Sequence, residues 1–376
     1  MRAKVKEILW TALEYVFWFF PVKNKIVFNN FNGRGFGCNP KYIALGCIDA
    51  NLDAELVWLG SKYYDGIPKE ISQVLWGSLR FYYELATAKV IVTNVTNLLP
   101  VIKKKKQYWI ETWHGSFSPK MLEFDAQESL SSDYIKGIKK MIPQIDLFLS
   151  NSGMQTQEYR NAFKYEGEIM KYGYPRNDCL VNANVDTVNS IKNKLHLENK
   201  KIVLYMPTFR GDGDMHPYDI NVNAVMESVV KRFQGEWIFA VRLHPNIADK
   251  KIKNNGIDID FTNYPDPQEL LLIADILITD YSTVMFDFSI MDKPVFLFAN
   301  DIKKYSEKIR RLKPIFWELP FPLAESSVDL CEKISDFNES AYRRQVKNYM
   351  SVYNSAESGK ATIKIVDKMI MVMKEK

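Results

Sequence analysis

The stretch DILITDYSTVMFD, at residues 275–287 of the 376-residue chain, contains the pattern that decides the fold. A short apolar run comes first, a polar cluster follows it, and a second apolar-rich segment comes next. A run this brief and rich in isoleucine and leucine is too short for a typical helix and indicates a buried strand. The stretch therefore predicts a strand, a polar loop and the start of a helix.

The same kind of apolar run recurs along the chain in two series, with helix-length segments between the runs. The first series stands at 25–28, 55–59, 90–93, 107–110 and 146–150, and the second at 201–205, 237–242, 275–279 and 294–298. Strands that alternate with helices form parallel sheets, and a chain of this length has room for two domains. We predict an α/β protein of GT-B-like type, with two Rossmann-like domains at 24–178 and 179–376 facing across a cleft.

The first 23 residues form a separate segment with an aromatic, amphipathic pattern. Residues 8–20 are mostly apolar, but they include Glu14 and end before Pro21, so the stretch is too short to span a bilayer. Lysines and an arginine flank it, and it contains tryptophans, which suits a helix lying in a membrane interface. We predict a membrane-associating helix at 1–23. The alternative is a helix that packs on the N-terminal domain.

Composition sets broad limits on the function. Hydrophobic residues make up 47% of the chain and charged residues 25%, which is typical of a folded globular protein. The formal net charge of +5 mildly favours anionic partners such as nucleotides or acidic lipid headgroups. The four cysteines show no CxxC spacing, which indicates reduced cysteines in the cytosol. No P-loop, HExxH or GxSxG motif occurs, so we expect no cofactor, no required metal and no nucleic-acid partner.

Two histidines follow predicted strands, where ligands of open parallel sheets bind. His114 stands just after the run at 107–110, and His244 just after the run at 237–242. An imidazole at His114 can take a proton from an attacking hydroxyl, and His244 can donate a hydrogen bond to a diphosphate. The alternative for each is an ordinary core or surface histidine.

Other strand ends carry residues suited to phosphate. Arg210 offers a planar, permanently charged fork, and the segment from Asp280 to Thr283 places hydroxyls at the start of a predicted helix. Asp280 or Ser282 as a plain helix cap is the alternative there. The glycine-rich loop at 32–37 follows the first strand, either to approach a ligand or simply to make a tight turn.

These strand-end motifs together resemble the CDP-glycerol glycerophosphotransferase family of teichoic acid synthesis. The matching segments are Trp113-His114-Gly115, GYPRND at 173–178, PTFR at 207–210, His244-Pro245, the stretch 275–287 and GCNPKY at 37–42. The resemblance implies that His114 is the base that activates an acceptor hydroxyl and that His244 supports the donor diphosphate. The donor and phosphate side would comprise Arg210, Thr208, Asp280, Ser282, Thr283 and Arg176. The acceptor side would comprise Gly33, Gly35, Gly37, Asn39 and Gly115.

The resemblance also implies a reaction and a place for it. We expect transfer of glycerol phosphate from CDP-glycerol to a hydroxyl of a lipid-linked saccharide, with release of CMP, by a peripheral protein at the cytoplasmic membrane face. The chain has about the length of the family's catalytic core, which favours a priming enzyme. The alternatives are a CDP-ribitol or other polyol-phosphate polymerase, a nucleotide-sugar glycosyltransferase of the same fold, and a nucleotide- or lipid-binding protein without turnover. The segment Ser116-Phe117-Ser118 departs from the family pattern and leaves the acceptor open.

Overall fold

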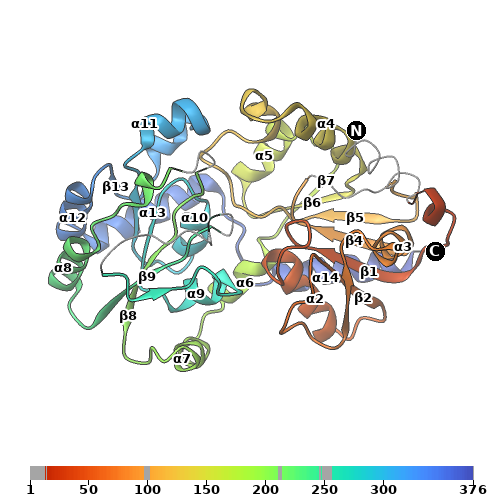
Figure 1. Cartoon of the computed structure of the whole chain (residues 1–376), viewed down its shortest axis with the longest axis horizontal. Helices are drawn as coiled ribbons and strands as arrows, with labels where there is room; N and C mark the ends of the chain where they lie inside the picture. The colour runs from red at the N-terminus through yellow and green to blue at the C-terminus, as the bar shows by residue number, and fades with distance from the viewer. Residues whose placement is uncertain are drawn as a thin grey trace. The chain divides into compact units, whose positions relative to one another are not determined.

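The computed structural model describes residues 13, 15–96, 102–210, 214–244, 247 and 256–375. Internal contacts divide the chain into two compact units. The first unit comprises Met1–His114, Leu130–Asp178 and Ala356–Lys376, and the second comprises Gly115–Ser129 and Cys179–Ser355. Each unit contains a parallel sheet with helices packed on it, which confirms the predicted α/β class (Figure 1).

The sheet of the first unit has the strand order β3-β2-β1-β4-β5-β6-β7, with every pairing parallel. Its strands are β1 (Lys23–Asn29), β2 (Glu55–Gly60), β3 (Ile71–Leu75), β4 (Ala88–Thr93), β5 (Tyr108–Glu111), β6 (Leu147–Ser150) and β7 (Glu168–Lys171). The chain adds strands outward from β1 to β3, returns to place β4 on the other side of β1, and then continues outward to β7, so the strand order reverses between β1 and β4. The carboxyl ends of β1, β4 and β5 therefore lie side by side.

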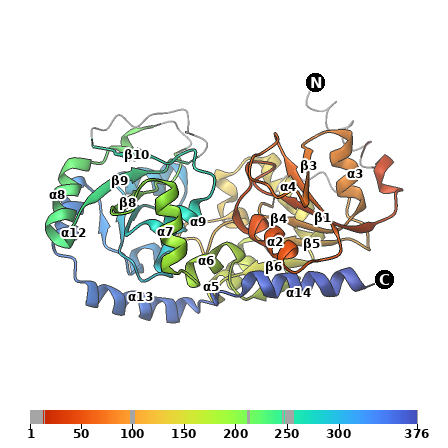
Figure 2. The same ribbon diagram turned by 90° about the horizontal axis from the view of Figure 1, so that it is seen from below.

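Helices cover both faces of this sheet. On one face α2 (Cys38–Asp49) and α14 (Ala361–Lys374) lie together, as Figure 2 shows, and their apolar residues share a core with β1, β4 and β5. The other helices of the unit are α3 (Leu79–Thr87), α4 (Ser132–Met141), α5 (Gly153–Ala162) and the start of α6 (Asp178–Val181). Asp178 caps α14, because its two carboxylate oxygens accept the N–H groups of Ala361 at 2.9 Å and Thr362 at 2.7 Å.

The second unit has a parallel sheet in the order β10-β9-β8-β11-β12-β13. Its strands are β8 (Lys201–Tyr205), β9 (Trp237–Val241), β10 (Ile259–Asp260), β11 (Ile276–Thr279), β12 (Val295–Phe298) and β13 (Leu323–Ala324). Its helices are α7 (Val185–Lys194), α8 (Val222–Phe233), α9 (Pro267–Ile273), α10 (Val284–Ser289), α11 (Ile302–Lys304), α12 (Ser327–Ser335) and α13 (Glu339–Tyr353). Helices α8 and α12 lie side by side in both views (Figures 1 and 2).

The predicted strands are confirmed at all nine positions, but β3, β7, β10 and β13 escaped prediction. These four lie at the edges of their sheets. An edge strand is less enclosed than a central one, so it need not carry a continuous apolar run. In β7, for example, Glu168 and Lys171 are exposed.

The compact units differ from the predicted domains in two segments. Residues 115–129 belong to the second unit, because Met121 N–H donates to the Arg311 carbonyl at 3.0 Å and Lys313 N–H to the Pro119 carbonyl at 2.8 Å. Residues 356–376 belong to the first unit, because α14 buries its apolar face there. Each segment is separated along the chain from the rest of its unit, so a division of the sequence into two continuous ranges cannot assign it.

Most of the predicted N-terminal helix, residues 1–12 and 14, lies outside the described residues. Within the rest, residues 15–18 are helical, and the rings of Phe17 and Phe20 contact Tyr83 with centroids 6.1 and 5.7 Å away. In the described part of the chain, no helix combines the length and apolar character needed to cross a bilayer.

Candidate active site

His114 stands at the end of a sharp turn that begins where β5 stops. Trp113 has a φ of 53°, a left-handed conformation that a bulky residue rarely adopts. The buried carboxylate of Glu111 holds this turn, because it accepts the Trp113 N–H at 2.8 Å and the Thr93 hydroxyl. Asn39 adds a second support by donating its amide to the carbonyls of Thr112 at 3.4 Å and Trp113 at 3.2 Å. The turn is thus fixed from both sides.

The imidazole of His114 has a defined orientation. Its Nδ1 atom lies 2.7 Å from the carbonyl oxygen of Asn94, the residue that follows β4. A carbonyl oxygen only accepts hydrogen bonds, so Nδ1 carries the hydrogen. In the neutral ring the lone pair then belongs to Nε2, which is the atom able to take a proton from a hydroxyl.

The predicted acceptor-side residues fall into two groups. Gly33 and Gly35 have φ values of 88° and 72°, and Gly37 precedes α2, so the glycine loop does follow β1 in the first unit. Asn39 is buried beneath the turn that carries His114. Gly115, by contrast, belongs to the second unit.

Gly115 lies against the predicted donor segment. A Cβ atom at this position would be only 2.8 Å from the hydroxyl oxygen of Thr283, at the start of α10. Both residues belong to the second unit, so this contact is internal to it. The residue after His114 is therefore a glycine because a side chain would meet Thr283.

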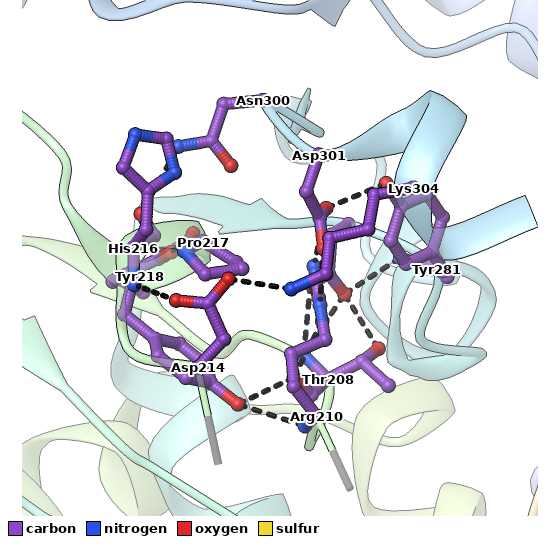
Figure 3. Close-up of polar contacts among 12 residues, drawn as sticks. Thr208, Arg210, Asp214, His216, Pro217, Tyr218, Tyr281, Asn300, Asp301 and Lys304 are labelled. Carbon is purple, nitrogen blue, oxygen red and sulfur yellow. Dashed lines mark hydrogen bonds and ion pairs between the residues drawn. The ribbon is translucent and has the colours of Figure 1, made fainter. Parts of the chain in front are cut away.

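Arg210 and Asp280, which are buried, form one polar network in the second unit with the half-buried Thr208. Figure 3 shows Arg210 and Thr208 beside Asp301. Arg210 Nε and Nη2 donate to the two carboxylate oxygens of Asp301 at 2.7 and 2.9 Å. Its Nη1 donates to Asp280 at 2.8 Å and to the Thr208 carbonyl at 2.6 Å. Thr208 in turn donates both its hydroxyl and its N–H to Asp280.

Most donors of Arg210 are therefore used inside the protein. The side chain has five N–H groups, and the four bonds above involve protein acceptors. Burial opposes its charge, but the carboxylates of Asp280 and Asp301 hold the pKa of Arg210 above its ordinary value. The geometry makes Arg210 a support that joins the ends of three strands, and a phosphate contact would depend on its remaining N–H.

His244, Ser282 and Thr283 are more accessible than this network. The exposed ring of His244 stacks on Phe209, with centroids 5.4 Å apart and planes at 28°. Ser282 and Thr283 are half-buried, and the Ser282 hydroxyl accepts the Val284 N–H at 3.4 Å. Pro245 lies outside the described residues. His244 follows β9, and Ser282 and Thr283 follow β11, the two strands that flank β8 in the sheet.

Arg176 belongs to the set predicted to bind the donor and its phosphates. It is a buried residue of the first unit, where its N–H donates to Asn39 at 3.2 Å and its guanidinium lies 4.9 Å from the Tyr174 ring centroid. It therefore lies beside Asn39 on the side predicted for the acceptor.

Two further candidate residues, Asp301 and Lys120, were not predicted from the sequence. Asp301 follows β12, and inspection of the residues after that predicted strand would have found it. Lys120 had no comparable signal, because it is brought to its place near Asp280, Arg310 and Arg210 by backbone contacts between residues 119–121 and 311–313, which lie far apart in the sequence. Burial lowers the pKa of Lys120 to about 8, against the attraction of Asp280.

A metal site is not apparent in the part of the chain that the structure describes. Among those residues, no group of three or more histidine, cysteine, aspartate or glutamate side chains is arranged to hold an ion.

Each of the two units has a parallel sheet, and a histidine lies beyond a strand end in each. This arrangement fits an α/β transferase. The model of the CDP-glycerol:poly(glycerophosphate) glycerophosphotransferase family matches residues 13–371, and the chain belongs to that family. The predicted family and enzyme class are thereby confirmed.

Named relatives agree with this assignment. The chain is 29% identical over 360 residues to the teichoic acid glycerol-phosphate transferase of Staphylococcus aureus, covering 92% of each protein. It is 29% identical over 366 residues to the teichoic acid poly(glycerol phosphate) polymerase of Bacillus subtilis, covering 92% of this chain and 49% of the polymerase. A solved structure of the wall teichoic acid polymerase TagF, soaked with CDPG, aligns with a TM-score of 0.85 and 27% identity over 98% of this chain and 96% of that one.

Proposed function

We propose that the protein transfers glycerol phosphate from CDP-glycerol to a hydroxyl of a lipid-linked saccharide, with release of CMP, as a priming step in teichoic acid synthesis. The observation that carries the proposal is the hydrogen bond from His114 Nδ1 to the Asn94 carbonyl. It makes Nε2 the proton acceptor of the neutral ring, as hydroxyl activation requires. The near-full-length match to the teichoic acid glycerol-phosphate transferase of Staphylococcus aureus supports the transfer of glycerol phosphate.

The reaction balances without a cofactor. The acceptor oxygen attacks the phosphorus that bears glycerol, and its proton passes to Nε2 of His114. The new O–P bond forms as the bond from that phosphorus to the bridging oxygen breaks, and CMP leaves with the electron pair. The work of the protein is then positioning of the two substrates and stabilisation of the charge on the phosphates.

On the donor side, His244, Ser282 and Thr283 would contact the phosphates, while Arg210, Asp280 and Thr208 shape the loops that present them. The buried network supports this division, because its members already bond to one another. A GT-B-like fold with the donor on the second unit belongs to the same proposal. The exposed position of His244 is compatible with it.

The lipid-linked acceptor implies work at a membrane surface. We propose that the protein associates peripherally with the cytoplasmic face through its N-terminal segment. In the described part of that segment, Phe19 is 81% exposed, Tyr15 55% and Trp18 41%. Aromatic side chains suit the headgroup region of a bilayer. Sedimentation with phosphatidylglycerol vesicles should fall when Trp18 and Phe19 are replaced by serine, and unchanged sedimentation would contradict this part of the proposal.

The identity of the nucleotide product tests the central reaction. The protein is incubated with CDP-glycerol and a lipid-linked disaccharide, and the products are separated by chromatography. Release of CMP with one glycerol phosphate per acceptor is expected. Release of CDP indicates a glycosyltransferase-type reaction, a ladder of products indicates a polymerase, and turnover of CDP-ribitol alone shows that the donor is ribitol. Failure with every CDP-polyol would leave a binding protein.

A further inference from the structure

Asn94 joins His114 to the loop that follows β1. It is fully buried, and its side-chain Nδ2 donates to Asn30 Oδ1 at 2.7 Å. Its Oδ1 accepts the N–H of Phe31 at 2.8 Å. Its backbone carbonyl accepts the Nδ1 hydrogen of His114. One residue at the end of β4 thus bonds to the catalytic candidate and to the neighbouring loop at the same time.

The loop needs such a support, because its backbone is strained. Phe31 and Asn32 have φ values of 43° and 57°, two successive left-handed residues that are not glycine. Residues in this region are strained, and they persist where their surroundings hold them. The bond from the Phe31 N–H to Asn94 Oδ1 is a direct restraint of this kind.

The restrained loop places the Phe31 ring on His114. The two ring centroids lie 5.1 Å apart with planes at 63°, an edge contact. The centroid of the imidazole also lies 4.1 Å from that of the Trp113 ring. Asn94, Phe31 and His114 therefore each contact the other two residues. The backbone carbonyl of Asn94 fixes the Nδ1 edge of the imidazole, and the ring of Phe31 fixes its plane.

We infer that Asn94 is a positioning residue that holds His114 in the tautomer with the proton on Nδ1 and sets the Phe31 ring against the imidazole. The inference rests on the proposed role of His114 as the base. Only the tautomer with a lone pair on Nε2 can accept the hydroxyl proton at that atom. If the tautomer and the ring plane are no longer fixed, a smaller fraction of the enzyme is competent, and turnover falls in proportion.

The primary test is Asn94→Ala, studied in the full chain with ¹⁵N-labelled histidine. The His114 signal, assigned by its loss in His114→Asn, should report protonated Nδ1 in the wild type. Asn94→Ala retains the backbone carbonyl but removes the side-chain bonds to Asn30 and Phe31, so that the carbonyl is held less firmly and the signal should shift toward a mixture of tautomers. We expect kcat to fall on the order of tenfold to a hundredfold, with KM for CDP-glycerol changed less than about twofold. Asn94→Asp, which retains the acceptor for the Phe31 N–H, should recover part of kcat.

The matched control is Asn184→Ala. The Asn184 side chain also accepts a backbone N–H, from Thr187 at 2.8 Å, but it caps α7 in the second unit. Asn184→Ala should lower the stability of the protein without changing the His114 signal or kcat.

Each result separates the alternatives. An unchanged His114 signal and unchanged kcat in folded Asn94→Ala would overturn the inference. A changed signal combined with full activity of His114→Asn would uphold the positioning role and reject His114 as the base. If Asn94→Ala does not fold, Phe31→Leu replaces it, because that variant retains the backbone bond. A wild-type kcat in Phe31→Leu would then overturn the inference, and a fall of about threefold or more at unchanged KM would support it.

Discussion

Arg210 and Asp301 form a two-point ion pair in which both side chains are almost completely buried, with exposures of 1% and 4%. The guanidinium also lies 5.0 and 4.9 Å from the ring centroids of Tyr281 and Tyr305. A planar, forked cation fits this site, and an ammonium group does not. Arg210 therefore supports the donor-side loops through its shape as well as its charge.

The first prediction concerns Arg210→Lys. A lysine cannot bond to Asp301 and Asp280 together in this geometry, so buried carboxylates lose their partner. We expect the free energy of unfolding to fall by about 3 kcal/mol or more, measured by denaturant titration, with loss of CMP release. Arg343→Lys is the control, because that exposed residue pairs only with Glu339 one helical turn away and should change stability by less than about 0.5 kcal/mol. Equal stability of the two variants would show that the network is not a structural support.

The second prediction concerns the contact between Gly115 and Thr283. Gly115→Ala places a Cβ 2.8 Å from the Thr283 hydroxyl, so it should destabilise the protein by about 1–3 kcal/mol. Thr283→Ala removes that oxygen, and the next nearest atom, the Thr283 Cβ, is 3.6 Å away. In the background of Thr283→Ala, the Gly115→Ala substitution should therefore cost much less. A double-mutant cycle of unfolding free energies measures the coupling, and simple additivity would show that the two residues do not clash.

The central strands could be predicted from sequence because each is enclosed on both faces and reads as a continuous apolar run. β1, with five successive buried residues, is the clearest case. In β3 only the first and fourth residues are buried, and in β7 none is. Neither edge strand therefore has the continuous apolar run that predicted the central strands. The return of α14 to the first unit depends on a cap by Asp178, more than 180 residues earlier, and no local pattern shows that contact.

The candidate site, too, could be predicted from the sequence only in part. The rule that ligands bind at the carboxyl ends of parallel strands identified His114, Arg210 and Asp280, because each lies in the segment that follows an apolar run. The rule says nothing about which side chains bond to one another. The closed network of Arg210, Asp280 and Thr208, and the support of His114 by Asn94, depend on strands brought together by the sheet order.

The third prediction separates the two histidines from histidines elsewhere. His114→Asn and His244→Ala should each reduce the rate of CMP release by about a hundredfold or more, because each loses a general base or a group that stabilises phosphate charge. His196→Asn is the control: His196 is exposed with a φ of 57°, a conformation that asparagine tolerates. CMP release is measured by chromatography at saturating CDP-glycerol. Near-normal rates in both site variants would remove the histidines from the mechanism.

The fourth prediction follows from the lowered pKa of Lys120. Burial lowers this pKa from 10.5 to about 8, so between these two pH values the unfolded chain binds more protons than the native one. Stability rises with pH wherever the unfolded state binds more protons. The free energy of unfolding of the wild type, relative to Lys120→Met, should therefore increase from pH 7.5 to pH 10 by on the order of 2 kcal/mol. Lys136→Met, at a lysine whose side chain is 76% exposed, should show no such trend. Paired denaturant titrations at the two pH values give the difference in unfolding free energy between the wild type and Lys120→Met. A difference that stays constant or falls with pH would mean that the ammonium group of Lys120 is hydrated in the native protein.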